Sequence, residues 1–141
     1  MKYVLDASVG LKWVLIESDS AIASKLRDES SQGVHELIAP DIFPIEVAHA
    51  LTRAERRGIV KVGHASVLMA DVLRTSPALA PYIDLLPRAI ELSSQFRIGV
   101  YDCLYVALAE QQQCGVVTAD SRLISTFTGQ IDVVGLADLP S

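Results

Sequence analysis

The chain has 141 residues, half of them hydrophobic, and a formal net charge of −5 at pH 7. This length suits one domain with a sizeable core, and the acidic balance argues against a general coat for nucleic acid. No apolar run approaches the roughly 18 residues of a membrane span. Strand-like sequence from Lys2 leaves no room for a signal peptide, and two cysteines are too few for a disulfide framework. We therefore expect one cytoplasmic domain over residues 1–141.

The first half of the chain alternates short apolar strands with helices. A strand over Lys2–Leu5 ends at Asp6, and Ser8 is the expected N-cap of an apolar helix over Val9–Ile16. The pattern then predicts a helix from Asp19 or Ser20 to about Ser30, a strand over Leu37–Ala39, a helix from Ile42 or Pro44 to Arg57, and a helix over Gly63–Thr75.

The second half continues the alternation. It predicts a strand over Ile83–Leu86, a helix over Pro87–Phe96, a helix that begins near Gly99, a strand over Val116–Thr118, the start of another helix, and a strand over Ile131–Val134. The helix after Gly99 is apolar on most of its surface, so we expect it to be buried, with Gly115 as its left-handed C-terminal cap. Short apolar strands that alternate with helices indicate a parallel sheet with helices on both faces. The expected fold is a three-layer α/β domain with a short-stranded parallel sheet.

Four carboxylates are expected at the carboxyl end of this sheet. Asp6 and Asp120 each follow a strand, whereas Glu46 and Asp102 lie in the first turns of helices that begin on the same side of the sheet. An aspartate at a helix start is ordinary when it stands alone. Four unpaired carboxylates, however, would repel one another and raise one another's pKa values. A divalent cation removes that conflict, and an all-oxygen site suits Mg²⁺ or Mn²⁺.

Four short segments carry a resemblance to a known family: VLDASV at 4–9, PIEVAHAL at 44–51, YDCLYVALAE at 101–110 and TADSRL at 118–123. In their order and spacing they resemble the PIN domain, and in particular the VapC-type ribonuclease toxins of bacterial toxin–antitoxin pairs. The resemblance implies an endoribonuclease that depends on Mg²⁺ or Mn²⁺ and hydrolyses RNA phosphodiester bonds. It also implies a homodimer and a cognate antitoxin protein that masks the active site.

The resemblance also implies which residues act. Asp6, Glu46, Asp102 and Asp120 match the acidic residues of the family, which makes them the expected catalytic and metal-binding set. Thr118 matches a Ser/Thr that supports the site by hydrogen bonding, and Ser8 is assigned a supporting role beside it. His49 lies where many relatives carry Asn, and we expect a partly buried helix histidine there rather than a contact with the metal shell or the substrate.

Basic residues near the predicted site have two interpretations. Candidate RNA contacts are Arg53, Arg56, Arg57 and Lys61, at and just beyond the end of the helix that begins near Glu46. Cations near a helix C-terminus are nevertheless ordinary. Lys12 and Arg122 lie close in sequence to Asp6 and Asp120, and each either orients a carboxylate or phosphate or is simply solvated.

Three other functions were weighed against the nuclease. A phospho-acceptor receiver domain shares the fold class, but it would need an acidic pair after the first strand and a lysine after a late one, whereas Asp6 stands alone. A di-iron site is suggested by the spacing of Glu46 and His49, but such proteins repeat that motif on the helices of a bundle. A PIN fold kept only as a binding module, without nuclease activity, is disfavoured by the intact set of four acids.

Overall fold

The structure is a computed structural model that describes residues 1–129 and 132–139. Within these residues, five parallel strands form one sheet in the order β3-β2-β1-β4-β5. The strands are β1 (Lys2–Leu5), β2 (Glu36–Pro40), β3 (Ala78–Ala80), β4 (Gly115–Thr118) and β5 (Val133–Gly135). The central strands β1, β2 and β4 are almost entirely buried, which is typical of a parallel sheet covered on both faces.

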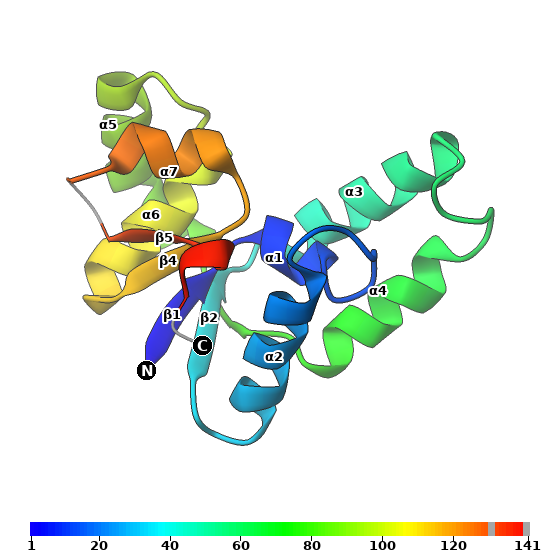
Figure 1. Ribbon diagram of the computed structural model, residues 1–141. Coiled ribbons are helices and arrows are strands. Elements are labelled where there is room, and N and C mark those ends of the chain that lie inside the picture. The colour runs from blue at the N-terminus through cyan, green and yellow to red at the C-terminus, as the bar shows by residue number, and fades with distance from the viewer. Residues whose placement is uncertain (130–131, 140–141) are drawn as a thin grey trace.

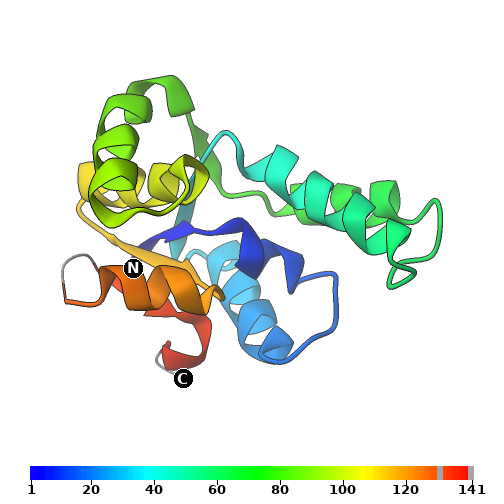
Figure 2. The ribbon, with the colours of Figure 1, turned by 90° about the horizontal axis from the view of Figure 1, so that it is seen from above.

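The helices are α1 (Ala7–Leu11), α2 (Ser20–Ser31), α3 (Phe43–Arg56), α4 (Ala65–Arg74), α5 (Leu86–Phe96), α6 (Val100–Gln112) and α7 (Ser121–Phe127). Two single 3₁₀ turns, η1 (Tyr82–Leu85) and η2 (Leu136–Asp138), complete the described elements. Figures 1 and 2 show α5 and α6 on one face of the sheet and α1 and α2 on the other, while α3 and α4 project together to one side. The predicted three-layer α/β fold is confirmed. None of the helices in the described part of the chain is long and apolar enough to cross a membrane.

Helix α6 is the central helix of the core. Every side chain from Cys103 to Ala109 is buried, and the helix packs on β1, β2 and β4 beneath α5. At its C-terminal end, Lys2 Nζ donates to Gln112 Oε1 over 2.6 Å, which places that end beside the start of β1. Helix α6 therefore runs antiparallel to the strands, and its first turn, with Asp102, lies at their carboxyl ends.

Helix α2 anchors both the N-terminal turn of the chain and the projecting pair α3–α4. Trp13 Nε1 donates to the carbonyl oxygen of Ala23 over 3.0 Å, and the Arg27 guanidinium lies 4.9 Å from the Trp13 ring centroid. The same guanidinium donates to the backbone and side chain of Asp71 in α4, over 2.6 and 3.0 Å. These contacts hold α4 against α2, and through α4 they steady α3, which carries Glu46.

The predicted helix over Val9–Ile16 with Ser8 as its N-cap is wrong. Helix α1 begins at Ala7, one residue after Asp6, and ends at Leu11. The chain turns there because Trp13 is drawn toward α2 by its bond to Ala23. Ser8 lies inside the first turn, and its hydroxyl bonds the Asp6 carboxylate instead of a backbone amide of the helix.

The predicted strand over Ile83–Leu86 is also wrong. The strand in this region is β3, and residues 82–85 form the turn η1 that leads directly into α5. Pro81 ends β3, and the amide of Tyr82 donates to Asp41 Oδ1 over 2.9 Å, which starts the turn. The alanines of β3 have a low strand propensity, so its sequence carries little signal.

Gly115 does not cap α6, because Gln113 adopts the left-handed conformation at that end, with φ of 54°. Gly115 is the first residue of β4, where a Cβ atom would lie 2.8 Å from Asp132 Oδ2. Close approach of backbone, rather than a positive φ, is what requires glycine here. The predicted last strand began at Ile131, which lies outside the described residues, and β5 covers Val133–Gly135.

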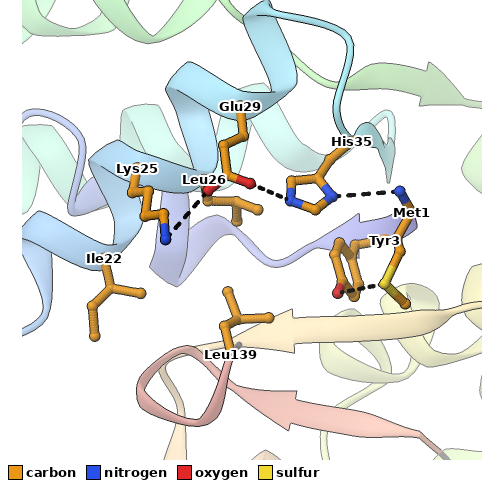
Figure 3. A pocket seen from close by; sticks show the side chains of 8 residues that line it. All are labelled: Met1, Tyr3, Ile22, Lys25, Leu26, Glu29, His35 and Leu139. Carbon is orange, nitrogen blue, oxygen red and sulfur yellow. Dashed lines mark hydrogen bonds and ion pairs between the residues drawn. The ribbon is translucent and has the colours of Figure 1, made fainter. Parts of the chain in front are cut away.

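The amino ends of β1 and β2, which we call the amino edge, border a small pocket beneath α2 with a volume of about 200 Å³. Figure 3 shows His35 and Glu29 facing each other there, with His35 Nε2 and Glu29 Oε2 2.9 Å apart. Lys25 Nζ lies 3.7 Å from the other oxygen of Glu29. The amine of Met1 donates to the carbonyl oxygen of Val34 over 3.0 Å. The Glu29 carboxylate therefore has both the Lys25 ammonium and the His35 ring as partners in this pocket.

Candidate active site

Asp6 is the most buried of the four predicted carboxylates. It ends β1 and stands at the N-cap position of α1, but its side chain makes no capping bond. Instead, Oδ2 accepts a hydrogen bond from Ser8 Oγ over 2.5 Å and another from Thr118 Oγ1 over 2.9 Å. Burial raises the pKa of Asp6, the two hydroxyl bonds lower it, and the charge of Asp120 raises it again.

The hydroxyls of Ser8 and Thr118 connect Asp6 to the loop after β4. Ser8 Oγ accepts from the amide of Ala119, and Thr118 Oγ1 accepts from the amide of Asp120, each over 3.0 Å. Each hydroxyl thus donates to the carboxylate and accepts from a backbone amide, so its hydrogen and a lone pair are both used. Both donors reach Oδ2, which leaves Oδ1 of Asp6 without either of them.

Asp120 lies close enough to Asp102 for its charge to act on the Asp102 carboxylate. Asp120 is the N-cap of α7, and its Oδ1 accepts from the amide of Arg122 over 2.9 Å. Asp102 lies in the first turn of α6, with Arg122 Nη2 3.7 Å from its Oδ2. Burial is the main cause that raises the pKa of Asp102 to about 6; the charges of Asp6 and Asp120 add to it, and Arg122 opposes it.

Glu46 is held by Tyr105, which lies in the helix that the sequence predicted to be buried. Helix α3 begins at Phe43 with Pro44 next to it, and Glu46 lies in its first turn, where Tyr105 OH donates to Glu46 Oε1 over 2.6 Å. Burial raises the pKa of Glu46, the Tyr105 bond lowers it, and the charges of Asp6 and Asp102 raise it. The sequence signal was a tyrosine one turn after Asp102 on a helix of Leu, Val and Ala, because a fully buried hydroxyl needs a partner.

The structure therefore brings Asp6, Glu46, Asp102 and Asp120 to the carboxyl ends of the strands, which we call the carboxyl edge. The charge of Asp120, at the start of α7, acts on Asp6 and Asp102, and the charges of Asp6 and Asp102 act in turn on Glu46 in α3. In residues 1–129 and 132–139, no three His, Cys, Asp or Glu side chains are already gathered closely enough to hold a metal ion. The donor set itself fits a hard divalent cation, because all donors are carboxylate oxygens whose charges are left uncompensated.

The predicted RNA contacts lie outside this group. Arg53, Arg56 and Arg57 are exposed near the end of α3, and Arg56 is ten residues from Glu46, or about 15 Å along the helix. Lys61 lines a different groove, together with Leu15 and Ile59.

Lys12 and His49 also lie elsewhere than the sequence analysis considered. Lys12 Nζ donates to the carbonyl oxygen of Ser18 over 2.7 Å and takes no part at the carboxyl edge. The predicted partial burial of His49 is wrong. Its side chain is exposed and lines a groove with Glu46, because it lies on the outer face of α3, away from the sheet.

Comparisons with known proteins agree with this fold. The family model described as "PIN domain" matches residues 3–126. The chain is similar to ribonuclease VapC3 of Pyrobaculum aerophilum, with 32% identity over 129 residues, 90% of this chain and 95% of that protein. It is also similar to ribonuclease VapC12 of Mycobacterium tuberculosis, with 32% identity over 121 residues, 85% of this chain and 88% of that protein. A toxin–antitoxin complex from Klebsiella pneumoniae contains a chain of the same fold, with a TM-score of 0.65, 14% identity and coverage of 97% of this chain and 99% of that one.

Proposed function

The chain belongs to the PIN domain family, and from this premise we propose that it is a VapC-type endoribonuclease that hydrolyses RNA phosphodiester bonds with the help of Mg²⁺ or Mn²⁺. The observation that carries the proposal is the carboxyl edge. Three of its four carboxylates, Asp6, Glu46 and Asp102, have raised pKa values from burial and from one another's charges. Folding does not need such an arrangement, because it opposes the ionised state of these groups.

Asp6, Glu46, Asp102 and Asp120 are the residues that would hold the cation. When bound, a divalent cation compensates their charges, polarises a phosphodiester oxygen and activates a water for in-line attack. Ser8 and Thr118 hold Asp6 in one orientation through Oδ2, and Tyr105 holds Glu46 through Oε1. Arg122, whose side chain is 72% exposed, provides a positive charge beside Asp102 that a phosphate could contact.

The alternatives fit the geometry less well. A receiver-like domain would need a lysine after a late strand, and the strand β4 is followed by Ala119 and Asp120. A PIN fold that only binds RNA or protein would have no need to orient Asp6 with two hydroxyls and Glu46 with a buried tyrosine.

We propose that the protein partner, a cognate antitoxin, masks the active site and is anchored by an apolar groove beside α1 and the α3–α4 pair. This groove, which we call the Ile59 groove, has a volume of about 540 Å³ and lies between the turn after α1 and the turn between α3 and α4. Its lining is Val14, Leu15, Ile16, Glu17, Ile59, Val60, Lys61, His64 and Leu68. Ile16 is 97% exposed and Ile59 is 70% exposed, which is unusual for isoleucines side by side on one surface.

The predicted homodimer would use another surface. Leu79, Tyr82, Ile83 and Ile90, in β3, η1 and α5, are all exposed apolar side chains outside the Ile59 groove. We expect light scattering at micromolar concentration to give the mass of a dimer, and co-expression with the antitoxin to increase that mass. A strictly monomeric protein would contradict the dimer.

The nuclease is tested with purified protein and single-stranded RNA. We expect cleavage with Mg²⁺ or Mn²⁺ and none after excess EDTA. A saturating cation should also raise the melting temperature, because a ligand at 100 times its Kd stabilises the folded state by about 2.7 kcal/mol. Cleavage that continues undiminished in excess chelator would overturn the metal mechanism, and incubation with a small phosphodonor that labels Asp6 would favour the receiver instead.

A further inference from the structure

A groove on α3 opens directly beside the carboxyl edge, and several of the side chains that line it are exposed and do not contribute to the core. This α3 groove has a volume of about 610 Å³ and is lined by Ile45, Glu46, Ala48, His49, Thr52 and Tyr101. The first five come from α3, and Tyr101 comes from the first turn of α6. Glu46 belongs both to the groove and to the carboxylate set, so the groove and the candidate active site are continuous.

Tyr101 is the aromatic wall of this groove. It is 61% exposed, although Tyr105 one turn later is fully buried, so its ring contributes little to the core. It directly precedes Asp102 in the chain, which places its backbone one residue from a carboxylate of the candidate active site. The bond from Tyr105 to Glu46 ties α6 to α3 and so fixes the spacing of the two walls.

The side chains in the groove match the chemistry of a nucleobase. An exposed aromatic ring offers a stacking surface, and Ile45, 66% exposed, offers an apolar surface among the residues of α3. The His49 ring and the Thr52 hydroxyl oxygen, whose hydrogen is donated to the carbonyl oxygen of His49, are polar groups suited to the edge of a base. Proteins that recognise single-stranded RNA hold splayed bases by this combination of stacking and edge contacts.

The charge along α3 favours RNA over a second protein chain as the occupant. Ile45, His49 and Thr52 follow one stripe of the helix at i, i+4 and i+7, and Arg56 continues that stripe at i+11. A strand of RNA whose phosphate lies at Glu46 would therefore pass along the groove toward an exposed arginine. The Ile59 groove, by contrast, shares no residue with the carboxyl edge.

We propose that the α3 groove binds the nucleobase next to the cleaved phosphodiester, with Tyr101 as the residue on which that base stacks. The proposal rests on the ribonuclease function proposed above and adds the determinant by which the enzyme selects its cleavage site. It predicts that substrate selection depends on a base at one fixed position beside the cleaved bond.

The test first selects, from a randomised pool of single-stranded oligoribonucleotides, those that the wild-type protein cleaves. Each selected oligoribonucleotide is then synthesised again with an abasic residue at one position near the cut, and successive positions are tested in turn. In the wild type, we expect one abasic position to lower kcat/KM by about 5- to 100-fold, the range that corresponds to the loss of one stacked base. Tyr101→Ala should lower kcat/KM on intact RNA by a similar factor, and it should show no further loss at that abasic position. Tyr101→Phe keeps the ring and should stay within about twofold of the wild type.

Val67→Ala serves as the matched control, because Val67 in α4 is an apolar side chain as exposed as Tyr101, at 61%, and lines neither groove nor the surface proposed for the homodimer. It should keep the wild-type abasic profile. Three results would overturn the proposal: wild-type kinetics in Tyr101→Ala, abasic losses that persist undiminished in that variant, or a change in its mass by light scattering, which would make the groove an interface between copies. A wild-type protein that cleaves no RNA would overturn the proposed function and this inference with it, whereas cleavage without dependence on Tyr101 would overturn the inference alone.

Discussion

The two ends of the same sheet differ in whether their carboxylates have partners that compensate the negative charge. At the amino edge, Glu29 lies between the Lys25 ammonium and the His35 ring, so this carboxylate has a cation and a ring nitrogen as partners (Figure 3). At the carboxyl edge, carboxylates face one another, and Arg122 beside Asp102 is the cation that an ion pair places there. The amino edge has the pattern of a structural contact. The carboxyl edge leaves charge uncompensated at a cost to folding, which is the pattern expected where a ligand supplies the missing charge.

The largest expected difference between the two edges is in activity. Asp102→Asn keeps the shape of the side chain and removes only its charge, so we expect RNA cleavage to fall by about 100- to 1,000-fold, a loss typical of one group that stabilises the transition state. The metal-free fold should stay intact, because one repelling carboxylate is gone. Cleavage assays with Mg²⁺ and thermal melts in EDTA measure the two effects. Asp28→Asn, at an exposed aspartate of α2, is the control, and full activity in Asp102→Asn would refute its role.

The second difference concerns pH. Asp102, with its pKa raised to about 6 in the fold against about 4 in an unfolded chain, binds its proton more tightly when folded. Stability from this group is therefore greatest at low pH and is lost as the pH rises from about 4 to 6, by at most about 3 kcal/mol. In EDTA, the melting temperature of Asp102→Asn should rise relative to the wild type across that window and then level off. A constant difference from pH 4 to 7 would show that Asp102 ionises normally.

The third prediction separates a carboxylate from the residues that orient it. Thr118→Val removes the donor to Asp6 and leaves the amide of Asp120 without its acceptor, with little change in volume. We expect about a 10- to 100-fold loss of cleavage, as for groups that orient metal ligands, and about 1–3 kcal/mol of stability. The control is Thr128→Val, because the hydroxyl of Thr128 donates only to an exposed backbone carbonyl at the end of α7. This variant should lose less cleavage activity and less stability than Thr118→Val. Equal losses of cleavage in the two variants would show that Thr118 does not support the active site.

The smallest effect is expected at the amino edge. Glu29→Gln removes the partner of Lys25 and His35, whose side chains are 53% and 16% exposed. Partly exposed pairs of this kind contribute roughly 1 kcal/mol or less, so chemical denaturation should show a small loss of stability and RNA cleavage should stay within about twofold of the wild type. A large loss of cleavage would mean that the amino edge is not merely structural.

Most of the fold could be predicted from the sequence, because the positions of most helices and strands depend on neighbouring residues in the chain. Strands β1 and β4 are short and mostly apolar, and α3 has Pro44 in its first turn and Gly58 two residues after its end, so their positions follow from short-range rules. Strand β3 was missed because three residues of Ala and Leu at the border of the sheet carry little strand signal. The strand is specified instead by its pairing with β2, which is a tertiary contact.

The carboxylates of the candidate site were predictable because the carboxyl ends of parallel strands meet by topology alone. The side chains that orient these carboxylates were only partly predictable. Thr118 could be named from the resemblance, whereas the bond from Tyr105 to Glu46 joins residues 59 positions apart and depends on how α6 packs against α3. The exposure of His49 likewise depends on α3 projecting away from the sheet, which the periodicity of a single helix does not specify.

Trp13 is the one tryptophan of the chain, and its position decides what its fluorescence can report. The indole is buried between α1 and α2, bonded to Ala23 and covered by Arg27, and it directly precedes Val14 at the rim of the Ile59 groove. Its emission should therefore respond to unfolding of the α2 layer and to a partner that docks in that groove. The filling of the carboxyl edge by a cation, in contrast, should leave it nearly unchanged. The protein thus carries a built-in optical probe that distinguishes the arrival of a protein partner from the binding of a metal ion.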